Sequence, residues 1–82
     1  MDVQQEVLHA LDEALSLRGR ALGFTRETHL LGDLPELDSM AVVTVIATLE
    51  DRFGIVVDDD DIDGQTFASV GSLTDFVQSK LG

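Results

Sequence analysis

The chain contains no cysteine, tryptophan or tyrosine, and it has a single proline. The absence of cysteine excludes disulfide bonds and metal sites built on thiolates. No apolar run approaches the roughly 20 residues of a membrane-spanning helix, so we expect no membrane insertion. The segment Met1–Glu6 is polar and acidic, whereas a secretion signal begins with basic residues followed by an apolar stretch. These features predict a cytoplasmic protein.

Basic residues are also scarce. Five lysines and arginines stand against sixteen acidic residues, for a formal net charge of −11. Such a field repels nucleic-acid phosphates, so we expect no nucleic-acid partner, and it favours partner proteins with basic surfaces. Hydrophobic residues make up 44% of the chain and fall in periodic stripes, which argues against disorder. We expect residues 1–82 to form one small domain and a monomer.

Helical periodicity predicts three substantial helices. The first spans Val3–Leu17 and is capped by Asp2. The second spans about Ser39–Phe53, with Gly54 as a left-handed stop. The third follows a cap at Ser69 or Ser72. The expected inward faces are Val3, Val7, Ala10, Leu11 and Ala14, flanked by Leu8 and Leu15; Val42, Val45, Ile46, Leu49 and Phe53; and Val70, Leu73, Phe76, Val77 and Leu81.

Two connecting segments lack a sustained period. Residues 18–38 form a long loop, with a short helical turn expected near Thr28–Leu31; such loops are often functional. Its expected apolar anchors are Phe24, Leu30, Leu31 and Leu34. Residues 55–57 are expected to be an extended linker, and a short helix or turn is expected around Ile62 and Phe67. The sequence therefore predicts an all-α fold, with three main helices and one short one.

The sequence offers little for catalysis. His9 and His29 are the only histidines, and neither belongs to a recognisable base-and-orienter arrangement. Ser39 is not surrounded by the G-x-S-x-G pattern of a hydrolytic serine. We therefore expect that the chain is not an enzyme.

The acidic run at residues 58–63 resembles the opening of a calcium-binding loop. Asp59, Asp61, Asp63 and Gly64 have the spacing of an EF-hand, but the twelfth position, which needs a bidentate glutamate, is Val70. We expect no metal site, and a solvated acidic surface is the simpler interpretation. A calcium-responsive binder is kept as a third functional alternative.

The most informative segment is Asp38-Ser39-Met40, where a polar loop meets an apolar helix. Together with Leu37 before it and the run Leu49-Glu50-Asp51-Arg52-Phe53-Gly54-Ile55 at the end of the same helix, it resembles the acyl carrier protein family. The order of the helices, the long loop and the acidic stretch follow that family over nearly the whole chain. The resemblance implies a four-helix carrier-protein bundle.

The resemblance also implies a function. Ser39 would receive a 4′-phosphopantetheine arm from coenzyme A through a magnesium-dependent phosphopantetheinyl transferase, and Asp38 would support that transfer. The arm would hold acyl or aminoacyl groups as thioesters. Further partners would be an acyl-loading ligase or acyltransferase and downstream acyl-using enzymes. A helix N-terminus suits the added phosphodiester, because its N–H groups and dipole favour an anion.

The exposed side of the second helix is the family's partner-binding surface. By this resemblance the surface comprises Met40, Val43, Thr44, Ala47, Glu50 and Asp51. Many family members carry an acid where Thr44 stands, so we expect a more apolar surface whose specificity depends on shape. The alternative is that Val43 and Ala47 pack inward.

The loop before the serine departs from the family pattern. Glu36 stands where the family often has glycine, which adds charge near the attachment site. The string from Leu34 to Met40 also resembles carriers of bacterial exosortase systems. The competing function is an unmodified acidic interaction module, in which Ser39 serves only as a helix cap.

Overall fold

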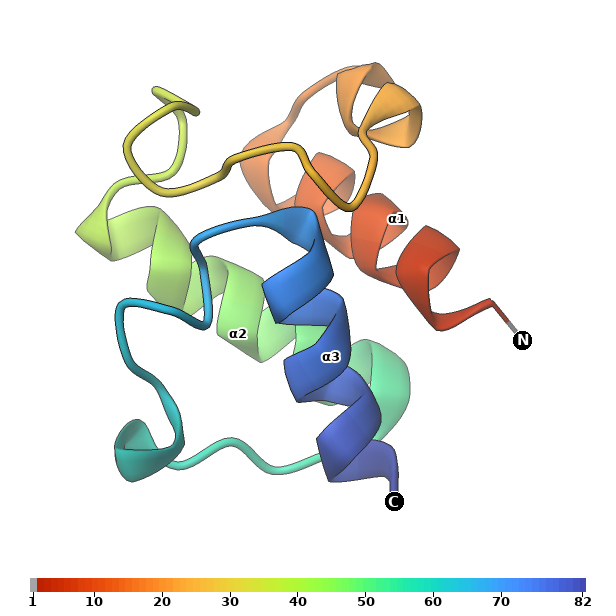
Figure 1. The fold of residues 1–82 in the computed structure, drawn as a ribbon, viewed down its shortest axis with the longest axis vertical. Coiled ribbons are helices and arrows are strands. Elements are labelled where there is room, and N and C mark those ends of the chain that lie inside the picture. Colours follow the sequence, from red (N-terminus) through yellow and green to blue (C-terminus); the bar gives the residue numbers. More distant parts are fainter. Residues whose placement is uncertain (1) are drawn as a thin grey trace.

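The computed structural model describes residues 2–82, apart from the side chain of Asp59. Three α-helices, α1 (Val3–Leu15), α2 (Ser39–Phe53) and α3 (Val70–Leu81), are joined by segments that contain two 3-10 turns, η1 (Arg20–Gly23) and η2 (Asp59–Asp61) (Figure 1). The predicted all-α fold is confirmed. Of the short helix or turn expected around Ile62 and Phe67, η2 lies just before Ile62, and a turn closed by the bond from the Ala68 N–H to the Gln65 carbonyl contains Phe67. Within residues 2–82, no helix is long and apolar enough to cross a membrane.

Helix α1 is the centre of the bundle, because it packs against both α2 and α3. Asp2 caps it as predicted, accepting a hydrogen bond from the backbone N–H of Gln5 at 3.3 Å. Leu8 and Leu15, expected on the flank, lie in the core. The core consists of Val7, Leu8, Ala10, Leu11, Leu15, Leu17, Ala21, Leu30, Leu37, Val45, Leu49, Ile55, Phe67, Val70, Leu73 and Val77.

Helix α1 ends two residues before the predicted boundary. Ser16 takes a left-handed conformation with φ 54° and stops the helix, and Leu17 then folds into the core. The Asp12 carboxylate accepts hydrogen bonds from the backbone N–H groups of Gly19 at 2.8 Å and Ala21 at 3.2 Å. These bonds organise η1, which the sequence pattern did not predict, since they join residues seven and nine positions apart.

The long loop runs across one end of the helices, from the end of α1 to the start of α2 (Figure 1). The helical turn predicted near Thr28–Leu31 begins two residues later, at Leu30, whose carbonyl accepts from the N–H groups of Asp33 at 3.2 Å and Leu34 at 2.9 Å. Residues 28–31 pair with the chain before α3. Leu30 and Leu31 donate backbone hydrogen bonds to the carbonyls of Ala68 and Phe67 at 3.0 and 2.9 Å. The helical turn therefore starts where this extended pairing ends.

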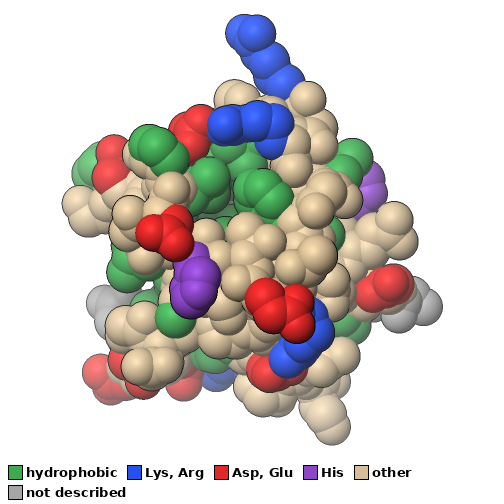
Figure 2. Space-filling model, turned by 45° about the horizontal axis from the view of Figure 1, so that its top comes forward, with side chains coloured by type: hydrophobic (Ala, Val, Ile, Leu, Met, Phe, Trp, Pro, Cys, Tyr) green, Lys and Arg blue, Asp and Glu red, His purple; other side chains and the backbone are tan. Residues whose placement is uncertain are grey.

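Of the predicted loop anchors, Leu30 is fully buried, and Phe24 and Leu34 are half-buried. Leu31 is exposed and is therefore not an anchor; Leu37, buried nearer the start of α2, pins the loop. Figure 2 shows the molecule with the end that the long loop covers turned forward. Hydrophobic side chains are grouped on this face, with Lys or Arg side chains at one edge.

Helix α3 begins inside this junction. Ser69 is its N-cap, in a capping box with Ser72. The N–H groups of Val70 and Gly71 donate to the carbonyls of Thr28 and Arg26, each at 3.0 Å. Gly71 favours this close approach, because a Cβ atom at this position would lie 3.1 Å from the Arg26 carbonyl oxygen.

The faces of α2 and α3 follow the predicted stripes with two differences. On α3, Leu81 was expected inside and is exposed, because it lies in the last turn, whereas Thr74 is buried. On α2, Val45 and Leu49 are fully enclosed, and the other three predicted residues of the stripe are half-buried. Gly54 ends α2 with φ 66°, as predicted.

Candidate functional site

The start of α2 is held by three successive contacts. The N–H of Leu37 donates to the carbonyl of Leu34 at 3.0 Å, which closes a turn with Pro35 at its second position, where proline is favoured. Leu37 then enters the core with 4% of its surface exposed. Asp38 follows in extended conformation and caps the helix, its Oδ1 accepting from the N–H of Ala41 at 2.8 Å. Ser39 is therefore presented at a fixed point.

Asp38, not Ser39, is the N-cap of α2. The Ser39 side chain is exposed, and within residues 2–82 its hydroxyl has no intramolecular hydrogen bond. The interpretation of Ser39 as merely a cap is therefore wrong. Asp38 performs the capping, and this leaves the Ser39 hydroxyl unengaged.

The other four serines have structural tasks. Ser69 and Ser72 bond to each other in the capping box of α3, and the Ser79 hydroxyl donates to the carbonyl of Phe76 at 2.7 Å. Ser16 provides the left-handed end of α1. Among the five serines, Ser39 alone sits at the first position of an α-helix.

The first turn of α2 can also hold an anion. Asp38 accepts hydrogen bonds from Ala41 and Val42, which are the third and fourth residues of the helix. Among the described hydrogen bonds, the N–H groups of Ser39 and Met40 have no acceptor. These two donors and the helix dipole favour a phosphate ester on the neighbouring hydroxyl. The residues present thus fit a phosphopantetheine group on Ser39.

The outer side of α2 carries an exposed apolar stripe. Met40 is 77% exposed and Val43 is 64% exposed, and Ala47 lies in line with them and is also exposed. The alternative in which Val43 and Ala47 pack inward is therefore wrong. Thr44 and Asp51 are exposed on the same helix.

Glu50 is placed differently from the other predicted surface residues. It is half-buried, and its Oε2 accepts from the N–H of Val57 at 2.9 Å. The carboxylate therefore fixes the linker that follows α2. Arg52, on the same helix, reaches Glu6 at 3.1 Å and Glu13 at 3.4 Å, and so joins α2 to α1.

Two carboxylates of the acidic segment, residues 58–63, form contacts within the chain. Asp61 pairs with Lys80 of α3 at 2.6 Å and accepts from the N–H of Asp58 at 3.0 Å. The Lys80 bond, followed by that from Asp58, lowers the pKa of the Asp61 carboxyl. Asp63 caps the next turn through the N–H groups of Gln65 and Thr66. The side chain of Asp59, the first position of the EF-hand-like pattern, lies outside the described residues.

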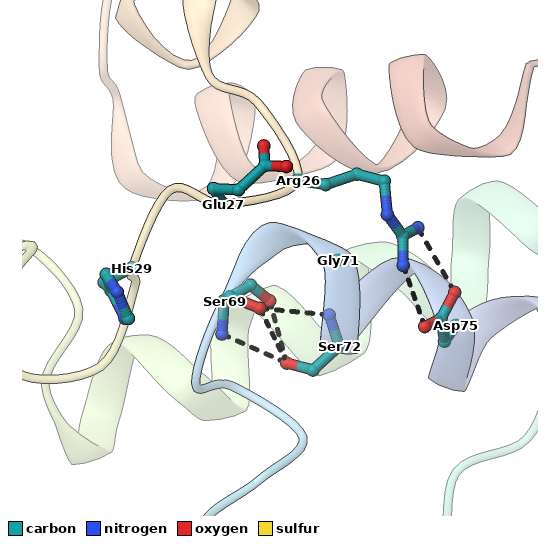
Figure 3. Close-up of a pocket in the computed structure, with 7 residues that line it drawn as sticks. All are labelled: Arg26, Glu27, His29, Ser69, Gly71, Ser72 and Asp75. Carbon is teal, nitrogen blue, oxygen red and sulfur yellow. Dashed lines mark hydrogen bonds and ion pairs between the residues drawn. The ribbon is translucent and has the colours of Figure 1, made fainter.

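A cleft of about 480 Å³ lies away from the predicted site residues, where the loop meets the start of α3 (Figure 3). Arg26 forms a two-point pair with Asp75 across it, at 3.2 and 3.0 Å. The bond to Asp75, and then its charge, raise the pKa of Arg26. His29 stands at one side and is exposed, as is His9 on α1. The polar groups of this seam largely satisfy one another, which favours a structural role.

Sequence reasoning missed the partner of Glu36. This carboxylate, three residues before Ser39, forms an ion pair with Arg20 of η1. A hydrogen bond from its own backbone N–H, and then the bond from Arg20, lower the pKa of the Glu36 carboxyl. The sequence signal that could have indicated this contact was Glu36 itself, a charged residue where the family often has glycine.

Comparisons with known proteins show the family of the chain. The family described as "phosphopantetheine attachment site" matches residues 5–77. The chain is 34% identical over 58 residues to an acyl carrier protein of Thermotoga maritima, covering 71% of this chain and 68% of that protein. It is also similar to the solution NMR structure of a holo acyl carrier protein from Nitrosomonas europaea, with 48% identity and a TM-score of 0.90 over 99% of this chain and 98% of the other.

These matches cover most of the chain, and the structural match extends to the whole bundle. The chain therefore belongs to the phosphopantetheine attachment site family, and it is a carrier protein with 4′-phosphopantetheine as its prosthetic group, not an enzyme.

Proposed function

We propose that Ser39 is the attachment residue and that the chain carries acyl or aminoacyl groups. The observation that supports this most is the unengaged Ser39 hydroxyl at the first position of α2, next to two N–H groups without a described acceptor. The Ser39 oxygen would form a phosphodiester with the arm of coenzyme A, releasing its proton and the nucleotide part. When bound, the arm supplies a thiol that holds cargo as a thioester.

Asp38 has two tasks in this proposal. One carboxylate oxygen accepts from the N–H of Ala41, which keeps α2 wound up to Ser39. The exposed carboxylate also stands beside the hydroxyl in sequence, where the family resemblance gives it a part in binding the magnesium ion of the transferase. A single side chain would thus fix the helix start and promote the modification.

The surface for partner enzymes is proposed on the outer side of α2. It comprises Met40, Val43, Thr44, Ala47 and Asp51, with Glu50 at its margin because one of its oxygens is occupied by Val57. Its centre is apolar and its far end acidic. A fitting partner therefore presents an apolar depression with a basic residue at one side, and shape contributes more than the number of ion pairs.

The general partners follow from the carrier role, which requires a transferase and enzymes that use the carried group. The finer identities, a phosphopantetheinyl transferase, an acyl-loading ligase or acyltransferase and downstream acyl-using enzymes, belong to this proposal. It also includes a single domain over residues 1–82, a monomer and a cytoplasmic location, where coenzyme A is available for the modification. Size-exclusion chromatography with light scattering tests the monomer, and cell fractionation tests the location.

The attachment residue is tested by incubating the purified chain with coenzyme A, magnesium and a broad-specificity phosphopantetheinyl transferase. Intact mass should rise by one phosphopantetheine in the unmodified wild type. Ser39→Ala should stay at its starting mass with unchanged helicity, since Asp38 retains the cap. A modified Ser39→Ala chain would exclude Ser39 as the site.

The docking surface is tested by Val43→Asp. Because Val43 is 64% exposed, the substitution should leave thermal stability within about 0.5 kcal/mol. It should weaken binding of a cognate acyltransferase to the holo chain, measured by titration calorimetry. Val56→Asp is the matched control, since Val56 is 73% exposed but lies in the linker after α2. Equal losses from both substitutions would contradict a surface centred on α2.

A further inference from the structure

The turn that leads into Ser39 is tied to a distant part of the chain. Arg20 and Glu36 are sixteen residues apart, and the Arg20 Nη2 atom bonds the Glu36 Oε2 atom. Glu36 occupies the turn closed by Leu34 and Leu37. Three residues span at most about 11 Å of extended chain, so the backbone of Glu36 lies within that distance of the backbone of Ser39.

The backbone on both sides of Arg20 is held by hydrogen bonds to α1. Asp12 of α1 accepts from the N–H groups of Gly19 and Ala21, on either side of Arg20. Ala21 is fully buried. Contacts therefore run without a gap from α1 through η1 to the turn before Ser39, while Glu36 itself is held by an exposed side chain.

The turn has few other restraints. The N–H of Leu34 bonds the carbonyl of Leu30, and the N–H of Leu37 closes the turn onto Leu34. Between them, Pro35 has no N–H to contribute, and the Glu36 N–H bonds the carboxylate of its own side chain. Pro35 and Glu36 are both exposed. Without the ion pair, residues 35 and 36 would gain conformational freedom, and an enzyme that grips the chain beside Ser39 would have to order them on binding.

We propose that Arg20 and Glu36 are positioning residues for the modification of Ser39, holding the preceding turn in the shape that the transferase recognises. This inference rests on the proposed attachment at Ser39. The pair acts on docking and not on the chemical step, so its loss raises the KM for the unmodified chain and leaves kcat unchanged. An exposed ion pair supports an effect of about two- to fivefold.

The test is a set of steady-state measurements with the transferase, following the mass gain on the full chain. Arg20→Gln and Glu36→Gln should each raise KM about two- to fivefold. The double variant should match either single variant, because both remove the same contact. Exchange of the charges, Arg20→Glu with Glu36→Arg, should restore most of the loss. Thermal unfolding of all variants checks that the bundle is intact.

Arg26→Gln is the matched control. The Arg26–Asp75 pair is similarly exposed and also fastens the long loop, but it lies at the start of α3. It should leave the KM of modification unchanged. Salt adds a second readout: the ratio of KM between Arg20→Gln and wild type should shrink toward one at about 1 M salt, where exposed pairs are screened.

The results separate the two proposals. A modified wild type with unchanged KM in Arg20→Gln and Glu36→Gln would overturn the positioning role and leave Ser39 as the attachment site. Additive losses in the double variant, or an equal loss in Arg26→Gln, would also overturn it. A wild type that gains no mass at Ser39 would remove the proposed function and this inference together.

Discussion

Asp38 offers a way to separate the folding of the site from its chemistry. Asp38→Ala removes both the capping oxygen and the charge, whereas Asp38→Asn keeps a capping oxygen and removes the charge. The structure assigns the cap to a 2.8 Å bond from the N–H of Ala41. Asparagine and aspartate cap helices about equally well, so the two substitutions differ mainly in that bond.

The expected magnitudes differ between the two readouts. Loss of the cap costs about 1 kcal/mol, which for an 82-residue chain lowers the melting temperature by about 4–8 °C. Asp38→Asn should melt within about 2 °C of wild type when measured at about 0.5 M salt, where the charge–dipole term is screened. Both variants should be modified more slowly by about ten- to hundredfold, because both lose the carboxylate that we propose assists the metal.

The assays are thermal unfolding followed by circular dichroism and transferase kinetics followed by intact mass. If Asp38→Asn were modified at the wild-type rate, the carboxylate would have no part in the transfer and the capping bond would be its entire role. If Asp38→Ala melted with wild type, the bond to Ala41 would contribute nothing to stability.

Two further predictions concern α3. Gly71→Ala should destabilise the fold by about 1–2 kcal/mol in thermal unfolding, because the new Cβ would lie 3.1 Å from the Arg26 carbonyl oxygen and this overpacking exceeds the gain in helix propensity. The control Gly23→Ala should be neutral, because its Cβ would meet no atom within 4 Å. Equal effects of the two substitutions would refute the steric argument. Thr74→Val should stabilise by about 1 kcal/mol in urea unfolding, since the Thr74 hydroxyl is buried without a partner among the described residues, and a loss of stability would reveal a hydrogen bond there.

The second helix was predictable to the residue. Its apolar periodicity ends at a glycine, and Asp38 provides the capping signal at its start, so local rules fix both ends. Helix α1 was predicted two residues too long, because the left-handed Ser16 at its end carries no glycine signal. Local sequence indicates the helices well where their stop signals are also local.

The long loop was not predictable in the same way. Its shape depends on Asp12 holding η1 and on Leu30 and Leu31 pairing with residues almost forty positions away. These contacts have no period and no local signature. The close approach of the loop to Gly71 has the same origin, since it results from Arg26 lying against the start of α3.

The residues of the candidate site also differ in whether the local sequence indicates their role or the fold is needed to show it. Asp38 and Ser39 were found from a short motif and the helix pattern around it. The sequence left open whether Val43 is exposed, because apolar residues also flank the buried stripe of α2. The structure places Val43 on the exposed side of the helix. The ion pair between Arg20 and Glu36 required the fold, since it joins two loop positions.

The proposed function depends above all on attachment of the prosthetic group at Ser39. The most direct measurement is to modify the wild-type chain enzymatically, digest it and locate the phosphopantetheine by tandem mass spectrometry. Attachment at Ser39 predicts a single modified peptide with the group on Ser39 and the other four serines unmodified. A group found on Ser16, Ser69, Ser72 or Ser79, or a folded and unmodified chain that accepts none, would contradict it.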